Sequence, residues 1–179
     1  MIQLSAMMWT LATFFAFIGF LRGWNRELVS TAGIILGLFA LFQFDSLLRG
    51  TLLASVPRDQ VFLVQAGVFI AIVFFAYQTR SVTAPDLRRQ SGRDNLQESV
   101  LGGLLGFLNG YLVWGSLWYF MDINEYPLAP HIIAPAPGSP SDQARSLLPL
   151  VILGGGPTGT GDLLAVAVII LFVIVLVLI

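Results

Sequence analysis

Long stretches without a charged side chain dominate the chain. Five such runs, mainly apolar, cover residues 2–21, 28–44, 61–79, 99–121 and 163–179. About 20 helical residues are needed to cross the roughly 30 Å hydrocarbon core of a bilayer, so each run is long enough, or nearly so, to span it. The pattern predicts an all-α, multi-pass transmembrane helical bundle with four core helices plus a C-terminal aliphatic transmembrane helix.

The spacing of these runs divides the chain into three parts. Residues 1–121 are expected to form the four-helix membrane domain, residues 122–162 a non-cytoplasmic loop rich in proline and glycine, and residues 163–179 the last helix. Seven of the nine prolines lie in the loop, which predicts an extended or irregular backbone. Within the loop, the apolar stretch 146–153 is interrupted by Pro149 and could lie at the membrane interface or enter the bundle.

The distribution of arginine predicts the orientation. Six of the nine arginines follow the first and third runs, whereas three follow the second and fourth. Basic residues concentrate in cytoplasmic loops. The N-terminus is therefore expected outside, and the C-terminus in the cytoplasm if the fifth run crosses the membrane.

The composition of the chain excludes several classes of function. The chain is 56% hydrophobic and only 11% charged, against about 45–50% and about 25% in soluble domains. A net charge of −1 gives no basic excess for nucleic acid. The chain has no cysteine, and its one histidine, His131, lies in the proline-rich loop. We therefore expect no enzyme activity, no catalytic, cofactor-binding or metal site, and no nucleic-acid partner.

Glycines recur at four-residue spacing in the runs. Gly102, Gly106 and Gly110 follow one another in the fourth run and share a helix face. Such a face lets another backbone approach closely, which is how membrane helices gain contact. The fourth run is therefore predicted to be the central packing helix. Shorter pairs with this spacing are Gly19/Gly23, Gly33/Gly37 and Gly67/Ala71.

Few polar side chains lie within the runs. Asn109 is the deepest and is expected to hold helices together through a buried hydrogen bond, with a substrate contact as the minor alternative. No run contains an acidic, basic or histidine residue, which argues against a pump or a secondary transporter. Trp114 and Trp118 are expected in an interfacial aromatic belt, the alternative being contact with a lipid, quinone or carotenoid.

Six residues, 22–27, separate the first two runs and leave room only for a tight helical hairpin. The charged side chains of this turn, Arg22, Arg26 and Glu27, could simply extend to water from the helix ends. Alternatively, they form a charged cluster that locks the hairpin or docks a cytoplasmic partner.

Two stretches, 19–28 and 98–112, resemble the colicin V production protein (CvpA-like) family, whose members carry an Arg-Gly-x-x-Arg-Glu turn after the first helix and a glycine-rich fourth helix. The similarity covers roughly residues 2–122, and the rest of the chain looks like an addition. Where the family often has an arginine in the fourth helix, this chain has Asn109. The residues that match are Arg22, Gly23, Arg26 and Glu27 in the turn, and Gly102, Gly106 and Gly110 in the helix.

The resemblance implies a bacterial inner-membrane protein that acts in toxin production or export, or in envelope maintenance, with no known catalytic activity. One alternative is an accessory structural subunit of a large photosynthetic or respiratory membrane complex, packed through helix faces and lipid. A channel or transporter component is the third. Membrane lipids and other membrane-protein subunits are the expected partners.

Overall fold

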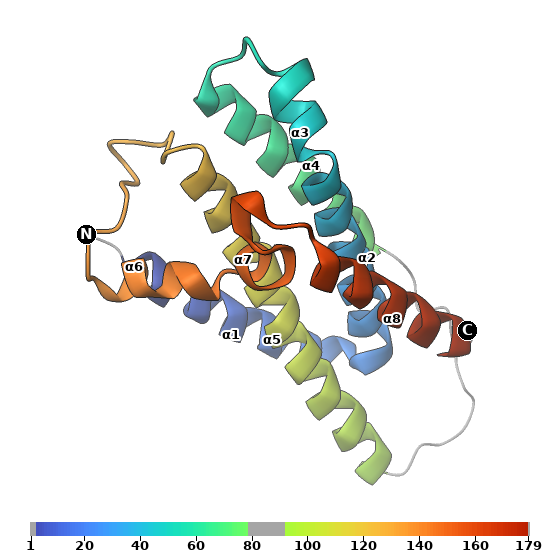
Figure 1. Ribbon diagram of the computed structural model, residues 1–179. Helices are drawn as coiled ribbons and strands as arrows, with labels where there is room; N and C mark the ends of the chain where they lie inside the picture. Colours follow the sequence, from blue (N-terminus) through green and yellow to red (C-terminus); the bar gives the residue numbers. More distant parts are fainter. Residues whose placement is uncertain (1–2, 79–91, 179) are drawn as a thin grey trace.

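A computed structural model describes residues 3–78 and 92–178, and within these ranges the chain is helical, without strands. Four helices are long and apolar enough to cross a membrane. This confirms the predicted all-α, multi-pass membrane fold. The four are α1 (Leu4–Arg22), α2 (Trp24–Gln43), α4 (Arg58–Gln78) and α5 (Gly92–Ile123) (Figure 1).

Shorter helices connect and extend these four. A turn of α3 (Asp45–Leu47) and the π-helix η1 (Leu48–Leu52) lead from α2 to α4. After α5 the chain forms a series of short elements before a last apolar helix. These are α6 (Pro140–Ala144), the 3₁₀ helix η2 (Arg145–Leu147), α7 (Pro149–Gly154), the 3₁₀ helix η3 (Gly156–Thr158) and α8 (Asp162–Leu178).

Helix α5 lies at the centre of the bundle. It packs against α1 along a long contact and against α2 on another side, while α4 and α8 both lie against α2 (Figure 1). Met8, Leu38 and Leu112 are at most 1% exposed where α1, α2 and α5 meet. Outward-facing side chains such as Phe75 and Val177 are also apolar, as expected of helices surrounded by lipid.

Glycines bring α1 and α5 into backbone contact. Gly19 faces Gly102 and Gly106, and a Cβ atom at Gly106 would lie only 2.9 Å from the Gly19 Cα. Gly110 meets Ala12 in the same way, at 2.7 Å. The pair at 67 and 71 is different, because a Cβ at Gly67 would have no neighbour within 4 Å. Four-residue spacing alone therefore does not mark a close-packed face.

The segment after α5 is more ordered than the proline content suggests. Short helices replace much of the extended backbone expected for residues 122–162. Pro149 starts α7 rather than interrupting a helix, because a first helical residue needs no N–H partner and proline has its φ already set. Leu148 and Leu150 are 0% and 1% exposed. Of the two placements expected for stretch 146–153, the structure has the one inside the bundle, with α7 packed against α5 and α8.

Helix α8 lies along α2 and places Leu164 at 0% exposure. Its 17 residues rise about 25 Å at 1.5 Å per residue, slightly less than the hydrocarbon core of a bilayer. Ile169, Phe172 and Val177 face outward. That the C-terminal helix crosses the membrane completely stays a prediction.

The two tryptophans expected in an interfacial belt have different surroundings. Trp118 is 3% exposed, and its indole N–H donates to the hydroxyl of Tyr126 at 3.0 Å, so it belongs to the core. Trp114 is half-buried. The expectation of a belt is wrong for Trp118, because the segment after α5 folds back and covers that end of the helix.

Candidate functional site

A single residue, Gly23, reverses the chain between α1 and α2. Its φ of +82° lies in the region that glycine adopts without strain. The turn is thus shorter than the six-residue interruption expected from the charges, because helix α2 already begins at Trp24. Arg26 and Glu27 consequently lie in the first turn of α2 and inside a helix long enough to span a membrane.

Glu27 is fully buried and is surrounded by hydrogen-bond donors. Its Oε1 accepts from the Arg22 guanidinium at 2.5 Å. Its Oε2 accepts from the Asn109 amide at 2.7 Å and from the Tyr77 hydroxyl at 3.1 Å. Both carboxylate oxygens are therefore engaged. We call these four residues, Arg22, Glu27, Tyr77 and Asn109, the buried ionic cluster.

Arg22 ties the cluster to a further helix. A second guanidinium nitrogen donates to the backbone carbonyl of Tyr77 at 3.1 Å. The guanidinium carbon also lies 4.5 Å from the centre of the Tyr77 ring, a cation–π distance. With 20% of its side chain exposed, Arg22 lies at the edge of the cluster, next to the surface.

The buried ionic cluster joins α1, α2, α4 and α5 at one end of the bundle. A buried charge is costly unless it is paired and hydrogen-bonded, and here one carboxylate has three donors. The arrangement suits a structural clamp. It also corrects the expectation that no membrane-spanning segment contains an acidic residue, since Glu27 lies in such a helix.

The other predicted site residues lie around the cluster. Arg26 is exposed. A Cβ at Gly23 would approach the Glu98 carboxylate to 3.1 Å, so the turn lies against α5. The remaining three, Gly102, Gly106 and Gly110, line the contact between α1 and α5.

Sequence reasoning missed two members of this region. Tyr77 lies 50 positions from Glu27 and reads as an ordinary aromatic residue at a helix end. Ser30 is fully buried one turn after Glu27, and its hydroxyl has two carbonyls within hydrogen-bond distance, that of Arg26 in its own helix at 3.0 Å and that of Ala76 in α4 at 3.3 Å. Ser30 could have been found from the sequence, because a residue three positions after Glu27 lies on the same face of a helix.

A second polar network lies at the opposite end of the bundle. Asp45, just after α2, accepts from the Gln65 amide at 2.8 Å. Gln65 in turn accepts from Asn124 at 2.9 Å, and Asn124 also donates to the Phe120 carbonyl at 2.7 Å. Gln65 and Asn124 are 2% and 4% exposed, so this chain of bonds is buried.

Between residues 3 and 78 and between 92 and 178, no group of three or more His, Cys, Asp or Glu side chains could hold a metal ion.

Of three comparisons with known proteins, one found a match. The family model described as colicin V production protein matches residues 4–136, which include α1 to α5 and the whole buried ionic cluster. Neither the curated proteins nor the solved structures contain a match. Because the family model covers most of the chain, the protein belongs to the colicin V production protein family.

Proposed function

We propose that this protein is a non-enzymatic component of the bacterial inner membrane that acts in toxin production or export, or in envelope maintenance. Membership of the family supports this assignment. The observation that carries it is the contrast between two neighbours in the turn. Glu27 is fully buried and occupied by three donors, whereas Arg26 is exposed.

The contrast indicates two roles in the turn, with Glu27 holding the helices together and Arg26 available to contact a partner. The buried ionic cluster fixes the start of α2 relative to the other helices, so that Arg26 is presented from a rigid base. In the described parts of the chain, the Arg26 side chain has no ion pair. The arginine distribution favours the cytoplasm for this end. Arg26 would therefore dock an acidic surface of a cytoplasmic partner.

Complementation of a deletion strain tests this role. Cells lacking the gene would receive the native protein, Arg26→Ala or the control Arg58→Ala, followed by measurement of toxin release and detergent sensitivity. Arg58 is a suitable control, because it is also exposed and its ion pair with Glu125 lies at the other end of the bundle. We expect Arg26→Ala to reach the membrane in normal amount but to fail in complementation. Full activity of that variant would refute docking through Arg26.

The orientation can be tested separately. Since the chain has no cysteine, single cysteines can be introduced without a background signal. A membrane-impermeant maleimide should label Ser139→Cys in intact spheroplasts but Arg26→Cys only after the membrane is opened. The reverse pattern would place the buried ionic cluster on the outer side.

An accessory subunit of a larger membrane complex is the second candidate. The outward face of α8 offers a surface on which a partner chain could replace lipid, because Ile169, Phe172 and Val177 are at least 62% exposed and entirely aliphatic or aromatic. Extraction in mild detergent followed by a native gel and mass spectrometry discriminates the two. Stoichiometric partner chains that dissociate when Phe172 is replaced by tryptophan would support the subunit role.

A further inference from the structure

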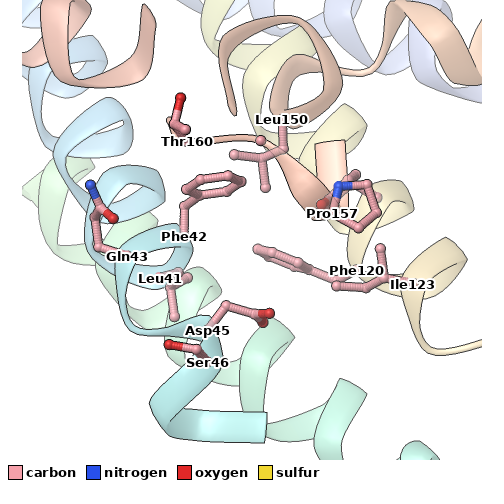
Figure 2. A pocket seen from close by; sticks show the side chains of 12 residues that line it. Leu41, Phe42, Gln43, Asp45, Ser46, Phe120, Ile123, Leu150, Pro157 and Thr160 are labelled. Atoms are coloured by element: carbon pink, nitrogen blue, oxygen red, sulfur yellow. The ribbon is translucent and has the colours of Figure 1, made fainter. Parts of the chain in front are cut away.

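A cavity of about 240 Å³ lies at the end of the bundle opposite the buried ionic cluster (Figure 2). It lies between the end of α2 and the end of α5, and residues 150–160 of the C-terminal segment form its third wall. Figure 2 shows the Asp45 carboxylate pointing from the α2 side toward the ring of Phe120. Its walls include Phe42, Asp45, Phe120, Leu150, Pro157 and Thr160.

Buried amides hold the Asp45 carboxylate in place. The Gln65 amide donates to Oδ1 at 2.8 Å, and Asn124 fixes Gln65 from the other side. Both amides are almost completely buried, whereas the Asp45 side chain is 37% exposed. Two core residues thus orient one carboxylate that faces a cavity. Support of this kind is typical of a binding group that must keep a fixed position.

The carboxylate retains capacity to accept hydrogen bonds. An ionised carboxylate accepts about four, and the short bond from Gln65 uses one. Arg49 contributes only a contact of 3.4 Å from Nε to Oδ2, longer than the roughly 2.7–2.9 Å of a strong charge-assisted bond. A ligand with a positive charge and N–H donors would compete well with this weak pair.

Aromatic rings form two sides of the cavity. The Phe42 ring fits against the backbone of the C-terminal segment, since a Cβ at Gly154 or Gly161 would come within 2.6 or 2.9 Å of ring atoms. Phe120 is held edge-to-face by Phe69 at 5.7 Å between ring centres. Ring faces attract cations, and apolar walls favour an alkyl group beside the charge.

We infer that this cavity binds a primary ammonium group carried on a short alkyl chain. The ammonium would donate to Asp45, and the alkyl carbons would contact Phe42, Phe120 and Leu150. The volume suits a small group but not a whole lipid. Two sources have this chemistry, a soluble alkylamine and the ethanolamine headgroup of a phospholipid, and Asp45 lies directly after a membrane-spanning helix, within reach of either.

Calorimetric titration of the purified full chain in a neutral detergent tests the inference, with n-butylammonium chloride as the probe. We expect binding to the native protein and about tenfold or greater weakening in Asp45→Asn, which keeps the acceptor for Gln65 but loses the charge. Arg49→Gln should bind more tightly, because it removes the competing cation. Asp59→Asn, which changes an exposed aspartate on the same side, should bind like the native protein.

A second variant covers the case in which Asp45→Asn does not fold. Thr160→Phe fills the cavity from the C-terminal segment without touching the carboxylate, and it should also abolish binding. The inference is overturned if the native protein does not bind butylammonium, if Asp45→Asn folds and binds equally well, or if 1-butanol binds as tightly as the amine.

Native mass spectrometry distinguishes the two sources. The protein would be extracted from vesicles of equal parts phosphatidylethanolamine and phosphatidylglycerol. Retention of phosphatidylethanolamine by the native chain but not by Asp45→Asn identifies the headgroup as the ligand. Equal retention of both lipids, together with butylammonium binding, identifies a soluble amine. Both results support the ammonium site, and neither depends on the role proposed for Arg26.

Discussion

Replacement of Glu27 by alanine removes the centre of the buried ionic cluster. Three donors lose their acceptor at once, namely the Arg22 guanidinium, the Tyr77 hydroxyl and the Asn109 side-chain amide. Asn109 is 0% exposed, so its amide cannot turn to water. Arg22 has 20% of its side chain exposed and can extend partly to the surface.

The expected loss can be worked from these contacts. Interhelical hydrogen bonds in membranes contribute about 0.6 kcal/mol on average and about 1.7 at most, so three give about 2–5 kcal/mol. Loss of one partner of a buried ion pair costs about 3–5 kcal/mol. Because Arg22 can reach water, we expect the lower part of both ranges. Glu27→Ala should therefore reduce the free energy of unfolding by about 3 kcal/mol.

Reversible unfolding in mixed micelles of dodecyl maltoside and dodecyl sulfate measures this loss, with circular dichroism as the signal. Glu125→Ala is the control, since it also removes one acidic partner of an arginine but from an exposed pair, which contributes about 0–1 kcal/mol. A double-mutant cycle with Arg22→Ala should show strong coupling. Equal losses for Glu27→Ala and Glu125→Ala would refute the clamp.

Three further predictions concern packing and pH. Gly106→Leu should sharply lower the yield of folded protein, because a Cβ there meets α1, whereas Gly67→Leu, which faces open space, should leave the yield unchanged when both are measured by size-exclusion chromatography. Leu150→Ala should destabilise the protein by about 2–5 kcal/mol and speed proteolysis of the C-terminal segment, since this side chain is 1% exposed; an unchanged digestion pattern would argue against the docking of α7. Burial raises the pKa of Tyr126 from 10.0 to about 12. The unfolded chain therefore loses the phenol proton at lower pH than the folded protein, and the free energy of unfolding should fall between pH 10 and 12. Unfolding measured at each pH should show a shallower fall in Tyr126→Phe.

Most of the bundle could be predicted from the sequence, because a membrane-spanning helix needs a long apolar run and little else. The start of α2 was harder to predict from the sequence. Three charged residues at 22–27 resemble an interruption, yet one glycine reverses the chain and the helix includes Glu27. Glu27 can be buried in the helix because hydrogen-bond donors from α1, α4 and α5 surround its carboxylate. These donors come from distant segments of the chain, so the local composition around Glu27 does not reveal them.

In the C-terminal half, local composition is misleading in the opposite direction, because it predicts less helix than the structure contains. Prolines after α5 suggest irregular backbone, but Pro149 and Pro140 both occupy first turns of helices, where proline is well accommodated. The Asn109 amide could be expected to have a partner from its depth alone. That the partner is a carboxylate in the first turn of α2 required the three-dimensional arrangement.

The position of α8 against α2 has a consequence for biosynthesis. About 120 residues separate the end of α2 from the start of α8, and their translation takes about 6–24 s at roughly 5–20 residues per second. During that time α2 has left the ribosome and its face for α8 contacts the translocon or lipid. On the prediction that α8 crosses the membrane, it must displace lipid from an α2 that is already inserted, so close van der Waals fit rather than exclusion of water drives the last step of assembly.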